Sequence, residues 1–471
     1  MSELFRMNEN ENDALGYNRR DFLKGGSVAT LMTMLGGVEL FAQTNAAPAE
    51  AKKAPAVKIK VAVIGLGAWG REIINTLMRL PQAQDPIDVE IVAICDTYPA
   101  SLKRTASAAP GAVQTADYKT ILDNKDIKAV IIATPTYLHK EVALAAIKAG
   151  KHVYCEAPLA GSIEDAREIA LAAKAAKNLV FQAGLQMRSD KQRLFLLPFI
   201  RTGALGKTVL ARAQWHKKTS WRSASPSPER EKAINWRLSK ETSLGLIGEI
   251  GSYQIDQAGW FMKALPKAVT GFGSVMFWKD DDRDVPDTVQ AVLEFPHGVQ
   301  MICDYTLANS FDGEYEMLYG SDAAIMMREN KAWMFKEVDA PLLDWEVYAD
   351  KVKFYSDTGI ALVAGKSGKS DTAKDKSKPE QPDPFSDTPL SFALNNFLRN
   401  ADEFSAKAET FKTSYGADDV DGLMDFLAKV LRRPAAGYLE GFQAVVTAVK
   451  ANEAILGSKR IELKPEWYEL S

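Results

Sequence analysis

A glycine-rich turn directly after an apolar strand constrains this chain more than any other feature. Residues 57–70 read VKIKVAVIGLGAWG, so a β-branched run leads into Gly65, Gly67 and Gly70. In a G-x-G-x-x-G turn the first glycine permits the bend, the second lets backbone approach a pyrophosphate, and the third lets the next helix pack close. The N-terminus of that helix favours an anion. The pattern predicts a dinucleotide-binding turn, with Ala68 and Trp69 among its contacts.

A second predicted strand, VEIVAICD, ends in Asp96. An acidic residue at this place accepts hydrogen bonds from the adenosine ribose hydroxyls. The same carboxylate would repel a 2′-phosphate, so the sequence favours NAD over NADP. A glycine-rich turn in some other α/β fold remains the alternative.

The N-terminal segment has the features of a targeting signal. Residues 18–24, NRRDFLK, resemble the twin-arginine export signal, and a weakly apolar stretch and a small-residue region follow. That stretch is short and contains Glu39, which suits a signal better than a membrane span. We expect residues 1–50 to be signal and linker, and the protein to be periplasmic or otherwise exported. No stable membrane span is expected after the signal is removed.

The composition is that of an ordinary globular chain, with 46% hydrophobic residues, 25% charged residues and a net charge of −3. This balance gives no reason to expect nucleic acid as a partner. The three cysteines and four histidines are scattered, so no metal site is predicted. A chain of 471 residues can hold two or three domains.

Residues 58 to about 185 alternate between strand and helix patterns. Strands are predicted at 58–64, 89–95, 128–133, 151–155 and 179–183. Helices are predicted at 69–80, 99–108, 117–123, 137–149 and 162–176. This alternation predicts an α/β domain with a doubly wound parallel sheet over residues 57–185, the NAD-binding Rossmann domain.

After residue 200 strand patterns follow one another with few helices between them. Strands are predicted at 207–219, 267–278, 287–295, 298–307, 314–320, 323–328 and 331–336. Helices are predicted at 245–263, 389–410 and 435–456. We expect residues 186–471 to form an α+β substrate and oligomerisation domain with a large, mostly antiparallel open sheet. Residues 364–389 are polar and lysine-rich and are predicted to be a disordered loop.

Two further motifs resemble the Gfo/Idh/MocA family of oxidoreductases. They are ATPTYLH at 133–139 and GKHVYCEAPLA at 150–160, and the stretches at 245–260 and 457–463 agree with them. The resemblance implies that Thr134 and Pro135 line the cofactor cleft and that His139 begins the helix beside it. It also implies that Glu156 contacts the nicotinamide half of NAD and that Pro158 fixes the loop between the domains. The resemblance also makes His139 a candidate contact of the cofactor, and a cap on its helix is the alternative.

The chain departs from the family at two places. Where most members have Glu-Lys-Pro with a catalytic lysine, this chain has Ala157. Where most have aspartate and histidine four residues apart, it has Glu249 and Tyr253, although Asp256 is retained. Helical spacing places Glu249, Tyr253 and Asp256 on one face. That face is either a buried polar network or a wall of the sugar site.

Three residues are candidates to take the proton of a sugar hydroxyl. Tyr253 can do so if its pKa falls below about 10, and Glu249 would oppose a tyrosinate. Glu249 could itself accept the proton. His216 is the third candidate and lies on the polar face of a predicted strand. The alternative is that this face is solvated or part of a subunit interface.

Loops near the predicted cleft carry candidates for sugar contacts. Arg188 and Arg237 could bind hydroxyls or a carboxylate, Asp256 could join them, and Trp236 could stack on a pyranose ring. Ion pairing and core packing are the alternatives for these residues.

Three functions fit these features. The first is an NAD-dependent oxidoreductase that transfers a hydride at a ring carbon of a sugar, polyol or glycoside. The second is an NAD-dependent glycoside hydrolase with a transient keto intermediate. The third is a non-catalytic protein that binds sugar or nucleotide. The open sheet and the resemblance also predict a homo-oligomer.

Overall fold

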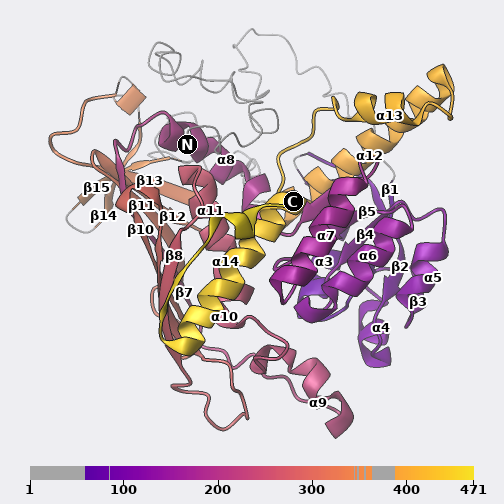
Figure 1. Ribbon diagram of the computed structural model, residues 1–471, viewed down its shortest axis with the longest axis horizontal. Coiled ribbons are helices and arrows are strands. Elements are labelled where there is room, and N and C mark those ends of the chain that lie inside the picture. The colour runs from indigo at the N-terminus through magenta and orange to yellow at the C-terminus, as the bar shows by residue number, and fades with distance from the viewer. Residues whose placement is uncertain are drawn as a thin grey trace, which may run out of the picture.

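A computed structural model describes residues 59–83, 85–343, 345–346, 349–354, 357–362 and 388–470. The predicted signal at 1–50 lies outside these residues, as does the predicted loop at 364–389 apart from its last two positions. The described residues form two sheets that lie side by side with helices between them (Figure 1).

The first sheet has six parallel strands in the order β3-β2-β1-β4-β5-β6. Its strands are β1 (Ile59–Ile64), β2 (Val89–Cys95), β3 (Val113–Thr115), β4 (Ala129–Ile132), β5 (His152–Cys155) and β6 (Phe181–Ala183). The helices that alternate with them are α3 (Ala68–Arg79), α4 (Pro99–Thr105), α5 (Tyr118–Asp123), α6 (His139–Lys148) and α7 (Ile163–Ala175). This order is that of the Rossmann fold, so the predicted doubly wound sheet is confirmed.

The second sheet has ten strands in the order β14-β15-β13-β12-β11-β7-β10-β9-β8-β16. Its strands are β7 (Thr208–His216), β8 (Ala268–Ser274), β9 (Thr288–Glu294), β10 (Gln300–Thr306), β11 (Glu314–Gly320), β12 (Ala323–Arg328), β13 (Lys331–Lys336), β14 (Lys351–Phe354), β15 (Asp357–Ala361) and β16 (Arg460–Glu462). Only the β7–β10 pair among these described strands is parallel. The predicted, mostly antiparallel sheet is therefore confirmed.

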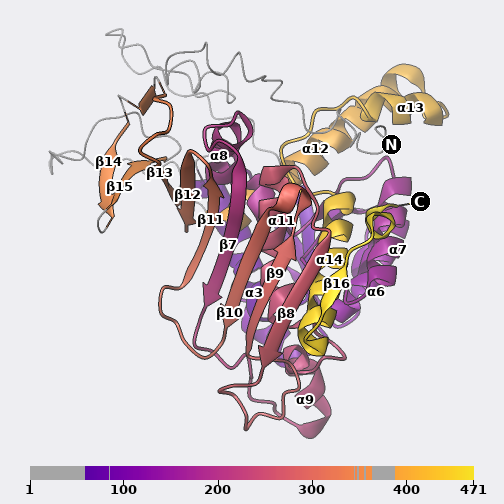
Figure 2. The same cartoon turned by 60° about the vertical axis from the view of Figure 1, so that its left-hand side comes forward.

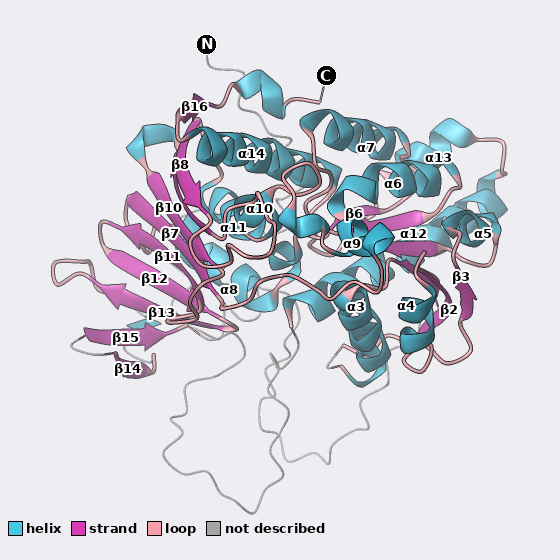
Figure 3. Ribbon diagram, turned by 90° about the horizontal axis from the view of Figure 1, so that it is seen from below, coloured by secondary structure: helices cyan, strands magenta, loops and turns pink. Residues whose placement is uncertain are grey.

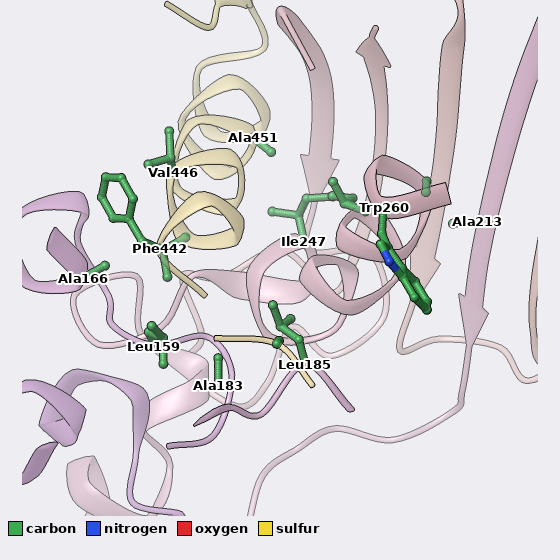
Figure 4. Close-up of a cluster of buried hydrophobic side chains, with 14 of the residues drawn as sticks. Leu159, Ala166, Ala183, Leu185, Ala213, Ile247, Trp260, Phe442, Val446 and Ala451 are labelled. Carbon is green, nitrogen blue, oxygen red and sulfur yellow. The ribbon is translucent and has the colours of Figure 1, made fainter. Parts of the chain in front are cut away.

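Helices fill the space between the two sheets (Figure 3). They are α8 (Lys191–Arg201), α10 (Gly245–Glu249), α11 (Gly251–Met262) and α14 (Tyr438–Gly457). One hydrophobic core runs through them from the Rossmann side to the strands, as Leu159, Phe442, Ile247 and Ala213 show (Figure 4). The other face of strands β7–β10 carries no helix of the described residues (Figure 2). A shared core packs the β6 edge of the first sheet against α14, where Leu159 and Ala183 lie beside Gly441.

Two elements differ from the sequence prediction in ways that affect the site. The predicted helix at 245–263 is broken at Ile250, whose φ and ψ are −119° and −53°, and glycines at 248 and 251 flank this break. Glu249 therefore ends one helix and Tyr253 lies in the next. Helix α12 (Pro389–Tyr415), predicted within the second domain, packs its apolar face on the Rossmann sheet instead.

Several short elements had no clear sequence pattern. They are β3, α8, α9 (Pro228–Ile234), α13 (Val420–Leu427), β14, β15 and β16. Helix α8 contains Pro198 in its interior, a residue that normally ends a helix. Strand β3 has no fully buried residue, so it lacks an apolar pattern.

Candidate functional site

The glycine turn has the geometry of an anion-binding turn. Gly65 has a φ of +96°, and a Cβ there would lie 2.5 Å from the Ala133 carbonyl. A Cβ on Gly70 would lie 1.9 Å from the Gly65 oxygen, whereas one on Gly67 would meet nothing within 4 Å. Gly67 to Trp69 are exposed at the N-terminus of α3, where no side chain caps the helix. The free N–H groups of this turn fit a pyrophosphate.

Asp96 is bound to the same turn. Its Oδ2 accepts a hydrogen bond from Leu66 N at 2.8 Å, and its Oδ1 accepts one from Tyr98 N at 2.7 Å. Each carboxylate oxygen has a second acceptor position, so ribose hydroxyls can still bind there. The structure therefore brings the predicted ribose-binding acid beside the predicted phosphate-binding turn.

Unpaired polar atoms lie at the carboxyl ends of β4 and β5. Thr134 Oγ1 and Glu156 Oε1 are buried atoms without a hydrogen-bond partner among the described residues, and Glu156 is only 4% exposed. A buried polar atom without a partner costs free energy until a ligand supplies one. Ligands of doubly wound sheets bind outside these strand ends. The donors and acceptors here fit the nicotinamide half of NAD, with Pro135 and Pro158 in the flanking loops.

His139 is buried beside the cleft. Its ring Nδ1 is 2.9 Å from the Pro158 carbonyl oxygen and its Nε2 is 2.9 Å from that of Thr134. Burial lowers the pKa of His139, in spite of these carbonyl contacts. The ring is therefore neutral and carries one N–H, which donates to one of the two carbonyl oxygens at a time. His139 packs between the loops that follow β4 and β5, and a contact of this residue with the cofactor stays a prediction.

The buried surroundings of Glu156 bring the pKa of its carboxyl close to neutral pH. Burial raises the pKa of Glu156 to about 7, although the polar groups of Trp69, the Ala157 N–H, Tyr154 and Tyr253 oppose the rise. A carboxyl with this pKa can accept or donate a proton at neutral pH.

Tyr253 points its hydroxyl at the loop after β5. Its Oη is 3.1 Å from the Ala157 carbonyl oxygen and 3.4 Å from Glu156 Oε2. Burial and the charges of Glu156 and Glu249 raise the pKa of Tyr253 well above its usual value. The condition that this pKa falls, under which Tyr253 alone could take the proton, is therefore not met. Tyr253 is a neutral phenol that can donate and accept hydrogen bonds.

Glu249 belongs to a satisfied buried network. Its carboxylate accepts hydrogen bonds from Thr136 Oγ1 at 3.2 Å, Ser243 Oγ at 3.3 Å and Leu244 N at 3.3 Å. Burial raises the pKa of Glu249, and Arg237 and these donors oppose the rise. Of the two interpretations of this helix face, the buried network describes Glu249. The sequence did not single out Thr136 and Ser243, because neither lies at helical spacing from Glu249.

Arg188 and Asp256 are paired with each other. Arg188 Nε and Nη2 donate to Asp256 Oδ2 and Oδ1 at 2.9 and 2.8 Å, and both side chains are largely buried. Burial opposes the charge of Arg188, but the Asp256 carboxylate outweighs it and raises the pKa of Arg188. This fork-to-fork pair braces α11 and leaves Arg188 poorly placed to bind a sugar.

Aromatic rings gather around Arg237. Its guanidinium lies 4.4 Å from the centre of the Trp236 ring and 5.8 Å from that of Trp221. Tyr137 contacts Trp236 edge to face. The charge of Arg237 also acts on Glu249 and on Tyr253. Arg237 thus lies near Tyr253, as a substrate contact requires, whereas Trp236 is only 8% exposed, so core packing describes it.

His216 lies away from this group. Its Nδ1 is 3.1 Å from the Phe311 carbonyl oxygen in the loop after β10, and its Nε2 is 3.4 Å from Asp304 Oδ2 on β10. Its hydrogen bonds in the structure do not reach Glu156 or Tyr253. The alternation of β7 places His216 on the face of the second sheet that no described helix covers, which we call the helix-free face. His216 therefore cannot take the substrate proton.

The described residues contain no group of three or more His, Cys, Asp or Glu side chains that could hold a metal ion. Within the same part of the chain, no helix is long and apolar enough to cross a membrane.

Two models of one family match the chain. The model described as "Oxidoreductase family, NAD-binding Rossmann fold" matches residues 59–184, and the "GFO/IDH/MocA C-terminal domain" model matches residues 198–326. Together they span more than half of the chain. The first description agrees with the turn, the acid and the unpaired atoms described above, and it confirms NAD as the cofactor.

Individual relatives cover different shares of the chain. Levoglucosan dehydrogenase of Pseudarthrobacter phenanthrenivorans is 34% identical over 149 residues, which are 31% of this chain and 36% of that protein. Inositol 2-dehydrogenase of Pseudarthrobacter chlorophenolicus is 33% identical over 34% of this chain and 47% of that protein. A 2,7-anhydro-N-acetylneuraminate hydratase of Mediterraneibacter gnavus is 26% identical over 65% of this chain and 79% of that protein. The chain thus spans less than half of the two dehydrogenases by sequence.

Solved structures extend the likeness to both sheets. Levoglucosan dehydrogenase in complex with NADH and levoglucosan has a TM-score of 0.63 at 20% identity, over 86% of this chain and 99% of that one. Aldose-aldose oxidoreductase of Caulobacter crescentus has a TM-score of 0.59 at 18% identity over the same share of this chain. At these identities the likeness shows the fold. From the two family models and this shared architecture, the chain belongs to the Gfo/Idh/MocA family of oxidoreductases.

Proposed function

We propose that this protein is an NAD-dependent oxidoreductase that acts on a ring carbon of a sugar, polyol or glycoside. The observation that carries the proposal is the neutral Tyr253 hydroxyl beside Glu156, at the strand ends where the nicotinamide half of NAD fits. Dehydrogenases of levoglucosan and of inositol among the relatives support a carbohydrate substrate.

The residues of this chain have distinct tasks in such a reaction. The glycine turn and the N-terminus of α3 bind the pyrophosphate, and Asp96 binds the adenosine ribose. Thr134 and Glu156 bind the nicotinamide half, which supplies the hydride acceptor. Arg237, whose guanidinium lies over the buried Trp236 ring, offers hydrogen-bond donors to the oxygens of the sugar. Tyr253 binds the hydroxyl whose carbon is oxidised.

A panel of glycosides and polyols, incubated with the NAD-loaded protein, tests this function. A keto sugar as product supports the oxidoreductase. Free sugar and aglycone as products would support the NAD-dependent hydrolase, which the alanine at position 157 leaves open. No product from any compound would favour the non-catalytic protein.

Bound NAD is expected to leave slowly. Arg230 of α9 lies 4.1 Å from the ring centre of Tyr98, whose backbone N–H binds Asp96, so α9 reaches over the adenosine end. A cation–π contact of this kind contributes about 0.5–2 kcal/mol. We expect Arg230→Ala to speed NAD release by about 2- to 30-fold, measured by stopped-flow displacement. Lys232→Ala, on the same helix without such a contact, is the control. Equal release rates for both variants, or tighter binding of NADP than of NAD, would contradict this expectation.

The helix-free face of the second sheet is proposed as a subunit contact. Phe272 and Ile302 are 56% and 37% exposed there, beside polar residues such as Gln290 and Asp304, and exposed apolar side chains on an uncovered sheet favour association. Ile302→Glu should convert an oligomer into monomers at micromolar concentration, measured by light scattering. Leu171→Glu, on α7, places the same charge on a helix surface and should leave the oligomer intact. A wild-type monomer would refute the proposal.

Export through the twin-arginine pathway is proposed from residues 18–24 alone. The need to fold around NAD before export gives the pathway a physical rationale. Replacement of Arg19 and Arg20 by lysine should retain the protein in the cytoplasm, as cell fractionation would show. Unchanged export would exclude this route.

A further inference from the structure

The contact between Tyr253 and Glu156 forms a path from the cleft to a buried carboxyl. Tyr253 is half-buried on α11, and Glu156 is 4% exposed at the end of β5. Glu156 Oε2 lies 3.4 Å from the Tyr253 hydroxyl. We propose that Glu156 is the terminal proton acceptor of the reaction and that Tyr253 relays the substrate proton to it. This inference rests on the proposed oxidoreductase function.

Tyr253 cannot end the path by itself. Burial and two neighbouring carboxylates raise its pKa well above the usual value, so a tyrosinate is strongly disfavoured. A phenol in this setting can accept a proton only while it gives its own proton away. Its hydroxyl has two acceptors in reach, and the Ala157 carbonyl cannot become protonated at neutral pH. Glu156 is the acceptor that can.

Glu156 is also the carboxyl within hydrogen-bond reach of Tyr253, because no hydrogen bond of the described residues joins Tyr253 to Glu249. Glu156 Oε1 has no hydrogen-bond partner among the described residues, whereas both oxygens of Glu249 already accept hydrogen bonds. Ala157 places no amine beside Tyr253. Glu156 is therefore the base that remains within reach of this hydroxyl.

The step balances without a further reactant. The hydride leaves the carbinol carbon for NAD, and the hydroxyl proton passes to Tyr253 Oη. At the same time the Tyr253 proton passes to Glu156 Oε2. The carbinol becomes a carbonyl, NAD becomes NADH, the Glu156 carboxylate becomes a carboxylic acid, and Tyr253 is unchanged. In the reductive direction the same groups return the proton.

This relay predicts the sign of the pH dependence. Glu156 must be ionised to accept a proton, and its pKa is about 7, so the oxidative kcat/KM should rise through about pH 7 and then level. The reductive kcat/KM should fall over the same range. The titratable side chains around the pair are Tyr154 and Cys155 beside Glu156, and Glu249 and Arg237 beside Tyr253. Burial raises the pKa of Tyr154 and of Cys155 well above neutrality, so neither produces this limb.

Kinetics of two matched variants test the relay, with the sugar or polyol that the panel identifies as substrate. Glu156→Gln should lower oxidative turnover by about 100-fold or more and abolish the limb near pH 7. Glu249→Gln changes the other buried carboxyl of the cleft and should keep that limb. A limb that persists in Glu156→Gln, or disappears in Glu249→Gln, would overturn the relay.

A second measurement needs no substrate. Because the Glu156 pKa is higher in the folded than in the unfolded state, the wild type should lose stability as pH rises toward about 7 and then level. Glu156→Gln should not lose stability in this way. The Tm of this variant relative to the wild type should therefore rise until about pH 7. The midpoint of this change is the pH at which half of the Tm difference has developed. In a Tyr253→Phe background this midpoint should move to higher pH, because the hydroxyl no longer stabilises the carboxylate.

The outcomes separate the relay from the function. An unmoved midpoint would show that Tyr253 and Glu156 are not coupled, and it would overturn the relay while sugar oxidation stands. A moved midpoint in a protein that oxidises no sugar or polyol would overturn the proposed function, and with it the use of this pair in catalysis.

Discussion

Replacement of Tyr253 by phenylalanine is expected to slow turnover by about 100-fold or more while the fold and NAD binding survive. The substitution keeps the ring and removes only the hydroxyl that lies 3.1 Å from the Ala157 carbonyl and 3.4 Å from Glu156. In the proposed reaction the lost atom is the one that binds the substrate hydroxyl. The measurement is kcat/KM in both directions, together with NAD affinity.

The variant also decides whether Tyr253 is only a packing residue. A packing residue that keeps its ring would leave kcat and KM unchanged. Turnover of Tyr253→Phe at the wild-type rate would therefore contradict its role. A change in KM alone would show that the hydroxyl binds the substrate without moving its proton.

The second large effect is expected at the buried Arg188–Asp256 pair. Asp256→Asn keeps the shape but leaves the Arg188 guanidinium largely buried without its charge partner. Breaking such a pair by removing one charge costs about 3–5 kcal/mol. Glu440, whose Oε1 is 3.9 Å from Arg188 Nη1, can offset part of this cost. Urea denaturation should show the loss in the free energy of unfolding.

Glu294→Gln is the control for this measurement. Glu294 pairs with Arg460 in the same bidentate manner but near the surface, where an ion pair contributes about 0–1 kcal/mol. If Asp256→Asn is no less stable than Glu294→Gln, the interior pair is not a brace of α11.

Much of the fold could be predicted because both sheets depend on patterns within short stretches. The run from Val61 to Ile64 is buried on both faces of a parallel sheet and is accordingly apolar at every position. The strands of the second sheet alternate, as β9 does with Val289, Ala291 and Leu293 buried. The family models confirm the fold that these patterns indicate.

The break at Ile250 and the position of α12 could not be predicted in this way. Both depend on contacts between residues far apart in the chain. Helix α12 has an apolar face, but its sequence does not say which sheet covers that face. A helical pattern also cannot reveal a single turn with non-helical angles between two helices.

The cofactor half of the site was more predictable than the catalytic half. The glycine turn depends on backbone geometry that local sequence encodes. The Asp96 carboxylate is held beside this turn by the Leu66 N–H. The pKa of Tyr253 depends instead on burial and on Glu156, which is 97 residues away. The pairing of Arg188 with Asp256 spans 68 residues. Sequence spacing placed these groups near the cleft but could not show which of them satisfy each other.

Single-turnover reduction of bound NAD would show directly whether the protein oxidises a sugar or polyol. The purified protein, with its NAD quantified after denaturation, is mixed with a panel that includes levoglucosan and inositol, and enzyme-bound NADH is followed by fluorescence. A single turnover needs no external acceptor to regenerate NAD. We expect NADH and a keto product in equal amounts with at least one sugar or polyol. A protein that binds NAD but forms NADH with none of them would contradict this expectation.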